Sequence, residues 1–535
     1  MALPGTEPAE RDDEVGSPPS LHYRVGCLWA ENEEGSSSVS GERLERRDLP
    51  GGALHDYATR CMTDAFLARQ GLARRRRGRR VVSGLFFYPR GGSAQVARAL
   101  GRALAQTGWE VTLAAGSLGQ VGEQTHAPTF FGALDLVTVD YSPDLQGAEG
   151  GVPFQPSYED RPGAPDRVFA MIDDDAYERL VDVWAEALER AGVARAEVLH
   201  LHHLTPANEA ALRAFPAVPV VGHLHGTELA LLRAIEAGAP AGWRFAVRWQ
   251  ERMRRWARAC ERLIVPPGAS AEIARLLALP RGAMVELPSG VELELFRRGP
   301  LDRRQRLAHW RRWLLEEPLG WDESGIPGSV AYQDDELWPL REAETILLYV
   351  GRFTAVKRLP LLVRAHAQAL EWLGRPLPLV LVGGSPGEWE GEHPLTVARA
   401  LGDRQVFLAG WRPHHELPEA LNAADLLVLP SVAEAFGLVL VEAMACGLPV
   451  IAADAHGPAQ LVAAGSGWLV PADDQNALAE TLLAVASDPQ ERRRRGNRAH
   501  QHSRASYGWP LVVARVVSIY DELAGRLPTQ RAART

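Results

Sequence analysis

Lysine is nearly absent from this sequence: Lys357 is the only one, and the other 57 of the 58 basic residues are arginines. Cysteine is also scarce, because the chain has four cysteines and no CxxC pair. Such spacing argues against a structural zinc site and against a disulfide scaffold, and it is typical of proteins kept in a reducing compartment. We therefore expect a cytoplasmic protein without a structural zinc ion.

Long hydrophobic runs are missing as well. No stretch of about 18 uncharged apolar residues occurs, which excludes a transmembrane helix. The N-terminal residues are acidic and rich in proline and glycine, with no apolar core, so they predict no signal peptide. The net charge of −9, from 58 basic and 67 acidic residues, gives no support for a nucleic-acid partner. A peripheral contact with a membrane stays open.

The rest of the composition is typical of a globular protein, with 46% hydrophobic and 23% charged residues. From residue 80 the pattern alternates strands and helices. VVSGLFFY at 81–88 is a continuous apolar run, which is typical of a parallel strand buried on both faces. The alternation restarts at ILLYVGR, near residue 345. Two such series predict an α/β protein with two doubly wound domains built on parallel sheets.

The length also supports several domains, because 535 residues correspond to three or four units of about 150 residues each. One stretch, 298–343, fits neither series of strands and helices. We predict a partly disordered N-terminal extension at 1–79, a first Rossmann-like domain at 80–297, a helical insertion or linker at 298–343, a second Rossmann-like domain at 344–505, a C-terminal helix at 506–525 and a flexible tail at 526–535.

The most informative segment is PSVAEAFGLVLVEAMACGLPVIAAD, at 430–454. It predicts a loop with Glu434, a helix that begins near Phe436 and Gly437, and Glu442 on the second turn of that helix. A helix N-terminus offers unpaired N–H groups to an anion, and glycine lets the backbone approach a ligand. The alternative, an ordinary strand-to-helix junction with two surface glutamates, is less favoured because these features occur together.

The two glutamates do not have the spacing of a glycosidase acid–base pair. Counted as eight helical residues, Glu434 and Glu442 would lie about 12 Å apart along the helix. Glycosidase carboxylates lie about 5 to 9.5 Å apart. We therefore expect these two side chains to hold separate ends of one long ligand.

A second segment, Gly351 to Arg358, follows the first predicted strand of the second series, and open α/β sheets bind ligands at the carboxyl ends of strands. Arg352 offers a planar fork for phosphate oxygens, and Lys357 offers a compact point charge. We interpret the single lysine as a sign of a phosphate site too tight for a guanidinium group; chance retention is the alternative. A Lys357 ammonium facing solvent, away from Glu434, would contradict this interpretation. No GxxxxGK[ST] sequence occurs, which excludes a Walker A loop.

Three segments together resemble a known family: Gly351-Arg352 with Lys357, Glu434 to Glu442 with Phe436-Gly437, and Pro288-Ser289-Gly290-Val291-Glu292 with Phe296. They are similar to the retaining GT-B glycosyltransferases of family four, and the resemblance covers residues 80–300 and 345–525. It implies two Rossmann-like domains facing a cleft, with the acceptor on the first and a nucleotide-diphospho-sugar on the second. The implied reaction transfers a hexosyl unit to an acceptor hydroxyl with retention of configuration, and it needs no cofactor or metal ion.

The resemblance also implies roles for single residues. Arg352 and Lys357 would bind the diphosphate, Glu434 the donor-sugar hydroxyls and Glu442 the ribose hydroxyls. His225, in His225-Gly226-Thr227-Glu228, resembles the family's histidine loop at the donor sugar, and it joins Arg352, Lys357 and Glu434 as an implied catalytic residue. The C-terminal helix would cross back to the first domain. The remaining implied donor-binding residues are Gly91, Gly92, Gly351, Ala435, Phe436, Gly437 and Leu438.

Four more histidines precede His225 in the predicted strands EVLHLHH and GHLH: His200, His202, His203 and His223. Five histidines invite a zinc hypothesis, but no cysteine or set of carboxylates accompanies them. We expect packing or loop hydrogen bonds for His200 and His203. His223 is a weaker candidate for the active site than His225.

Other functions stay open. A nucleotide-sugar epimerase or hydrolase could use the same scaffold, and a non-catalytic module that binds sugar nucleotides is a further alternative. The module is less favoured because Arg352, Lys357, Glu434 and Glu442 are all present. A dehydrogenase is disfavoured because no GxGxxG sequence follows a strand. The sequence identifies neither the acceptor nor the nucleotide nor the sugar.

Overall fold

The computed structural model describes residues 78–145, 153–160, 166–299, 301–463 and 465–525. The predicted tail at 526–535, and all but the last two residues of the predicted extension at 1–79, lie outside the described residues. Within the described part, no helix is long and apolar enough to span a membrane. The described chain forms two doubly wound α/β domains with parallel sheets, as the sequence predicts.

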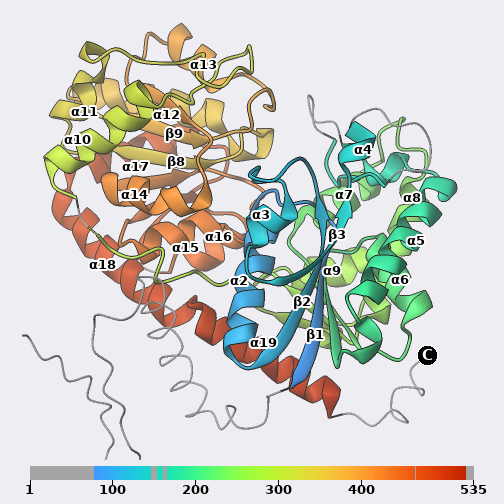
Figure 1. The fold of residues 1–535 in the computed structure, drawn as a ribbon. Coiled ribbons are helices and arrows are strands. Elements are labelled where there is room, and N and C mark those ends of the chain that lie inside the picture. Colours follow the sequence, from blue (N-terminus) through green and yellow to red (C-terminus); the bar gives the residue numbers. More distant parts are fainter. Residues whose placement is uncertain (1–77, 146–152, 161–165, 300, 464, 526–535) are drawn as a thin grey trace, which may run out of the picture. The chain divides into compact units, whose positions relative to one another are not determined.

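The first sheet has seven parallel strands: β1 (Arg79–Leu85), β2 (Trp109–Ser117), β3 (Asp135–Asp140), β4 (Val198–His202), β5 (Val220–His223), β6 (Arg262–Val265) and β7 (Met284–Glu286). Their order is β3-β2-β1-β4-β5-β6-β7 (Figure 1). The chain runs outward from β1 in both directions, and doubly wound sheets bind ligands at such a reversal. Val81 and Val82 are buried on opposite faces of β1, because successive side chains of a strand alternate.

Helices cover both faces of this sheet: α2 (Gly92–Gln106), α3 (Ala127–Phe131), α4 (Ser142–Leu145), α5 (Asp174–Arg190), α6 (Pro206–Ala214), α7 (Thr227–Glu236), α8 (Ala246–Ala259), α9 (Ser270–Leu277) and α19 (Trp509–Ala524). α2 and α19 lie on the face that buries Val81, and α5, α6 and α8 lie on the face that buries Val82 (Figure 1). α19 comes last in the described chain, yet its Val513, Val516 and Tyr520 are completely buried against the first sheet.

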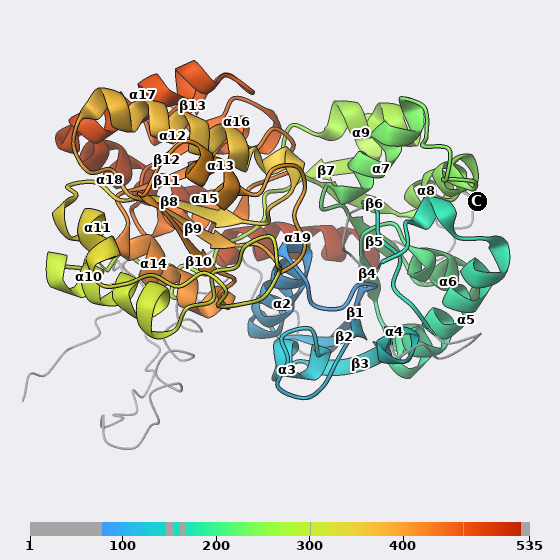
Figure 2. The ribbon, with the colours of Figure 1, turned by 90° about the horizontal axis from the view of Figure 1, so that it is seen from above.

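The second sheet has six parallel strands: β8 (Leu347–Gly351), β9 (Leu379–Gly383), β10 (Val406–Gly410), β11 (Leu426–Leu429), β12 (Val450–Ala453) and β13 (Gly467–Val470). Their order is β10-β9-β8-β11-β12-β13, so β8 has the same central place as β1 (Figure 2). Leu347, Val380 and Leu427 are completely buried, as expected for strands covered on both faces. The helices of this domain are α12 (Leu359–Leu373), α13 (Pro394–Ala400), α14 (Leu417–Ala423), α15 (Leu438–Ala445), α16 (His456–Leu461), α17 (Gln475–Ser487) and α18 (Pro489–Ser506).

The segment between the two sheets contains α10 (Arg303–Arg311), a π-helix (Arg312–Glu316) and α11 (Trp338–Glu342). It packs as part of the second domain, where three of its tryptophans are completely buried: Trp310, Trp313 and Trp321. The backbone N–H of Leu408 in β10 donates to the Tyr332 hydroxyl over 2.8 Å. The segment therefore covers the edge strand of the second sheet, which would otherwise leave backbone groups unpaired.

Two of the strands, β7 and β13, are not predicted from the sequence. They have three and four residues, and each lies at one edge of its sheet. An edge strand pairs on one side only and is commonly short. Such a strand lacks the continuous apolar run that identifies the central strands.

Candidate functional site

The loop after β8 carries Arg352 and Lys357, and it is held against the loop after β11. The backbone N–H of Val432 donates to the Val356 carbonyl over 2.9 Å, and the Ser431 hydroxyl donates to the same carbonyl over 3.2 Å. These bonds place the Lys357 ammonium beside the Glu434 carboxylate, and the two groups form an ion pair. The lysine side chain is only 13% exposed. It does not face solvent, so the outcome that would have contradicted the phosphate interpretation is not found.

Arg352 is paired with a carboxylate from the first domain. Its Nη1 donates to Glu159 Oε2 over 2.9 Å. Burial alone would lower the pKa of the Arg352 guanidinium, but the Glu159 carboxylate outweighs that effect and the pKa is raised. Arg352 is therefore a permanent cation whose predicted phosphate-binding fork already holds an anionic group of the chain.

Glu434 precedes helix α15, and Glu442 lies within it. Gly437 is the N-cap, with a left-handed φ of 92° that a side chain would disfavour, and the helix begins at Leu438. The predicted helix start is thus confirmed. The count of eight helical residues between the two glutamates is wrong, because residues 434 to 437 lie outside the helix.

Glu442 is buried and accepts a hydrogen bond from His414 Nε2 over 2.7 Å. Burial alone would lower the pKa of His414, but the Glu442 carboxylate outweighs it and the pKa is raised. No sequence pattern predicts a role for His414, which lies in a short 3-10 turn after β10. No sequence signal could have indicated it, because β9 and β8 separate β10 from β11, the strand that precedes the helix of Glu442.

Two first-domain glycine loops approach the segment at the start of α15. A Cβ atom on Gly226, which follows His225, would lie 2.1 Å from the Ala435 Cβ. A Cβ atom on Gly92 would lie 3.2 Å from the Leu438 Cδ1. Gly226 also has a φ of 102°, so two independent constraints favour glycine there. The structure thus brings the histidine loop and the glycine loop to the residues that follow Glu434.

The five histidines cluster at the carboxyl ends of β4 and β5, where four of them form two hydrogen-bonded pairs and ring contacts connect the pairs and His203. His202 Nδ1 contacts His225 Nε2 at 2.9 Å, and His200 Nε2 contacts His223 Nδ1 at 3.2 Å. The cluster reaches α19, because His200 Nδ1 contacts the Tyr520 hydroxyl at 2.6 Å. Burial lowers the pKa of His200 to about 3 and holds the pKa values of His202, His223 and His225 well below 6.5. These imidazoles are therefore neutral near pH 7.

Three of these histidines have the proximity of a metal-binding group. Ring nitrogens of His200, His202 and His223 lie within 4.8 Å of one another. Both ring nitrogens of His200 and the Nδ1 of His223 already take part in hydrogen bonds. A metal ion bound by His200 would have to displace one of its hydrogen bonds, so we assign these residues to the histidine cluster.

The histidine loop is braced by Glu228, which the sequence analysis quotes only as part of the loop. Its completely buried carboxylate accepts from the Gly226 backbone N–H over 2.9 Å and lies 2.6 Å from His203 Nδ1. The same carboxylate also accepts a longer hydrogen bond, of 3.3 Å, from the His225 backbone N–H. The carboxylate thus fixes the turn that carries His225.

Comparisons with known proteins identify the family of this chain. Residues 333–502 match the family described as glycosyl transferases group 1, and residues 90–295 match glycosyltransferase family 4. The chain is 33% identical over 351 residues to D-inositol 3-phosphate glycosyltransferase 1 of Catenulispora acidiphila, covering 62% of this chain and 74% of that protein. This chain belongs to the family-four glycosyltransferases.

A second relative of this glycosyltransferase is the D-inositol 3-phosphate glycosyltransferase of Kribbella flavida, 36% identical over 189 residues. That match spans 34% of this chain and 44% of the relative, less than half of its length. Sucrose-phosphate synthase from Thermosynechococcus elongatus has a TM-score of 0.59 at 20% identity, over 83% of this chain and 99% of that one. HepE of Anabaena, in complex with UDP-glucose, has a TM-score of 0.56 at 17% identity, with the same coverage. These structures show that the fold is GT-B.

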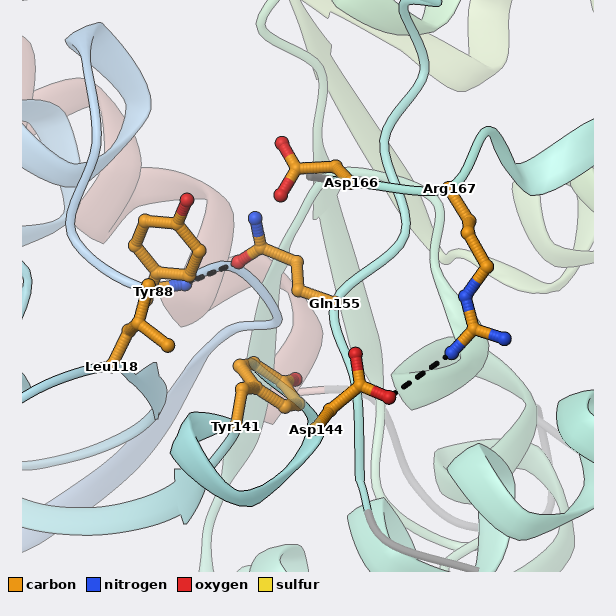
Figure 3. Close-up of a pocket in the computed structure, with 7 residues that line it drawn as sticks. All are labelled: Tyr88, Leu118, Tyr141, Asp144, Gln155, Asp166 and Arg167. Carbon is orange, nitrogen blue, oxygen red and sulfur yellow. Dashed lines mark hydrogen bonds and ion pairs between the residues drawn. The ribbon is translucent and has the colours of Figure 1, made fainter. Parts of the chain in front are cut away.

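The glycosyltransferase also has a pocket that no sequence pattern predicts, wholly within its first domain (Figure 3). Tyr88, Leu118 and Tyr141 contribute to it from positions just after the ends of β1, β2 and β3. The backbone N–H of Tyr88 donates to Gln155 Oε1 over 2.7 Å. The pocket is lined by Tyr88, Leu118, Tyr141, Asp144, Gln155, Asp166 and Arg167.

Proposed function

We propose that this glycosyltransferase transfers a hexosyl unit from a nucleotide-diphospho-sugar to an acceptor hydroxyl with retention of configuration. The observation that carries the proposal is the ion pair between Lys357 and Glu434 at the start of α15, with Arg352 on the same loop as the lysine. Two cations and a helix N-terminus at one place suit a diphosphate. The UDP-glucose complex of HepE, which shares the fold, supports a donor of this kind.

In the proposed reaction the bond between the sugar and the diphosphate breaks, and negative charge grows on the departing phosphate. Arg352, Lys357 and the N–H groups at the start of α15 would stabilise that charge. Such preorganised groups typically contribute about 3 kcal/mol each, or about a hundredfold in rate. The diphosphate would replace Glu159 as the partner of Arg352, because both anions need the same guanidinium.

The donor sugar would lie between Glu434 and His225. Because Nε2 of His225 contacts His202, its Nδ1 is the nitrogen that would meet the sugar. The depressed pKa makes His225 a neutral hydrogen-bonding group rather than a cation. Glu442 would hold the ribose hydroxyls, with its carboxylate oriented by His414.

We also propose that the reaction needs no metal ion and that the protein works in a reducing compartment. The two cations near the helix start would supply the charge that a divalent ion supplies in other transferases. Cys260 and Cys446 are buried, and burial raises the pKa of each thiol to about 12, so neither is a reactive thiolate. Unchanged turnover in a chelator would support metal-free transfer, and restored turnover on adding Mg²⁺ would contradict it.

The test of the proposed function is a donor screen with the purified chain. Thermal unfolding is measured with UDP, GDP and ADP and with their sugars, because a ligand bound far above its dissociation constant stabilises by a few kcal/mol. Products are then analysed with and without acceptor. Transfer only with acceptor supports the proposal; release of free sugar or conversion of the donor alone would identify the hydrolase or epimerase instead. Stabilisation without any turnover would identify the non-catalytic module.

A further inference from the structure

The segment between the two sheets reaches the loop that carries Arg352 through one tryptophan. Trp321 is completely buried, and its ring is stacked on that of Phe353, with a centroid distance of 5.2 Å and an angle of 28° between the ring planes. Trp389 and His393, from the loop between β9 and α13, complete the group, with ring centroids 5.9 Å and 4.9 Å from that of Trp321. We call Trp321, Phe353, Trp389 and His393 the aromatic brace. It joins a segment outside both sheets to the residue that follows Arg352.

The brace is packed directly on the backbone at the carboxyl end of β9. A Cβ atom on Gly384 would lie 2.7 Å from Trp321 Cζ2 and 3.0 Å from Phe353 Cγ. The same segment also meets the end of β10, because a Cβ atom on Gly410 would lie 1.9 Å from the Leu319 carbonyl oxygen. Such close approaches leave little room for the rings to shift. The segment that carries Trp321 therefore lies against the edge of the second sheet where Arg352 is found.

Hydrogen bonds fix the loop on both sides of Phe353. The Phe353 carbonyl accepts from the Glu390 backbone N–H over 2.9 Å, and the Glu390 carboxylate accepts from the Ala355 N–H over 2.7 Å. Phe353 pairs with the loop after β9 as an isolated parallel bridge, so the chain is extended there. Adjacent side chains of an extended chain point to opposite sides. Burying Phe353 in the brace therefore turns Arg352 to the other side, where its Nη1 meets Glu159.

We propose that Trp321 is a positioning residue for the donor diphosphate, which acts through Phe353 on the direction of the Arg352 guanidinium. This role rests on the proposed function, in which Arg352 binds the diphosphate. A guanidinium fork binds phosphate oxygens in a fixed direction, so a loop that can turn at Phe353 would lose part of that contact. The segment at 298–343 thereby takes part in donor binding without touching the donor.

The experiment compares a nucleoside diphosphate with its monophosphate, of the nucleobase that stabilises the full chain most in the donor screen. Calorimetry gives the ratio of the two dissociation constants, which reports the contacts of the second phosphate. Trp321→Leu should lower this preference for the diphosphate about tenfold, the typical loss when one charge-assisted hydrogen bond is misplaced. Trp321→Phe should restore most of the preference, because it keeps a ring and Trp321 Nε1 has no hydrogen-bond partner among the described residues. Phe353→Leu removes the other ring of the stack and should act like Trp321→Leu.

A double substitution separates positioning from a general loosening of the fold. If Trp321 acts through Arg352, Trp321→Leu should not change the preference further in the Arg352→Ala chain. The matched control is Trp310→Leu, since Trp310 is a completely buried tryptophan of the same segment whose ring packs near Trp313. It should lower the stability of the fold and leave the preference for the diphosphate unchanged.

A preference that both Trp321→Leu and Phe353→Leu leave unchanged would overturn the positioning role and leave the proposed function standing. A further loss of preference on adding Trp321→Leu to the Arg352→Ala chain would overturn it in the same way. Equal binding of monophosphate and diphosphate by the original chain would instead contradict the diphosphate site of the proposed function, and the role of Trp321 would fail with it.

Discussion

The carboxyl ends of the two sheets are built from different chemistry. The second sheet presents groups with formal charge, Lys357 paired with Glu434, and Arg352, whose partner Glu159 comes from the first domain. The first sheet presents neutral imidazoles in two hydrogen-bonded pairs, His200 with His223 and His202 with His225, and His200 also contacts Tyr520 of α19. One edge can stabilise charge that develops on a ligand. The other can hold a turn in place without adding charge.

This difference suits the two sheets to different parts of the proposed reaction. A departing diphosphate needs fixed cations, and these retain their charge only where carboxylates offset the cost of burial. A sugar with no charge needs hydrogen bonds of fixed direction, which a neutral imidazole provides. We therefore expect the second domain to supply the electrostatics of the proposed reaction and the first domain to fix the position of His225.

The largest expected effect comes from removing the Lys357 cation at the carboxyl end of the second sheet. Lys357→Ala should lower kcat/KM for transfer by about a hundredfold, because a preorganised cation near the leaving diphosphate contributes about 3 kcal/mol. Steady-state kinetics with the donor found in the screen measures it. The control is Arg358→Ala, the next residue, whose guanidinium pairs with Asp473 instead. Near-normal transfer by Lys357→Ala would show that this charge does not stabilise the leaving diphosphate.

The buried histidines of the first domain predict that the stability of the fold depends on pH. The histidines of the cluster have folded pKa values depressed below 6.5, so the unfolded chain binds more protons as the pH falls below 6.5. Their stabilising contribution is complete above pH 6.5 and is lost as the pH falls. Each histidine that becomes protonated on unfolding costs about 1.4 kcal/mol per pH unit.

Thermal unfolding measures this dependence in buffers between pH 5 and pH 8, spaced about one pH unit apart. His200→Gln, which removes one imidazole of the cluster, should flatten the curve below pH 6.5. The matched control is His415→Gln, since His415 lies outside the cluster, in the short turn after β10. A curve that stays flat down to pH 5 in the original chain would mean that the imidazoles are not buried as neutral groups.

A contact between the two domains offers an intermediate effect. Glu159→Gln keeps an oxygen that accepts from Arg352 but removes the negative charge that competes with a diphosphate. We expect a nucleoside diphosphate to bind about tenfold tighter, a change of about 1.4 kcal/mol. Calorimetry with UDP or GDP measures it. Asp473→Asn, which alters the pair of the neighbouring Arg358, is the control; weaker binding in Glu159→Gln would show that Glu159 assists the donor rather than competing with it.

The same contrast separates what the sequence could predict from what it could not. The charged residues of the second domain lie in two contiguous segments, Gly351 to Arg358 and Glu434 to Glu442. Local sequence patterns were therefore enough to predict the loop, the helix start and the central strands. The partners of these residues are not local: Glu159 lies 193 residues from Arg352, and His414 lies 28 residues from Glu442. No periodicity links such positions, because tertiary packing alone brings them together.

The histidine cluster also has partners that local sequence patterns cannot predict. The sequence places its five imidazoles at the ends of two strands, and it favours hydrogen bonds over a zinc site for His200 and His203. It gives no sign of Tyr520, which lies 320 residues from His200 and belongs to a helix at the far end of the chain. The register between β4 and β5, which pairs His202 with His223, also follows only from the folded sheet.

The smallest expected effect tests whether α19 supports the histidine cluster of the first domain. Tyr520→Phe removes one hydroxyl and leaves His200 Nδ1 without its partner in the interior, which should destabilise the fold by about 1 kcal/mol. Urea unfolding measures that loss. If the cluster transmits position to His225, KM for the donor should also rise while kcat changes little, because the charged edge is intact. The control is Tyr507→Phe, whose ring packs on Phe436 outside the cluster. A loss of stability without any change in KM would restrict α19 to holding the first domain together.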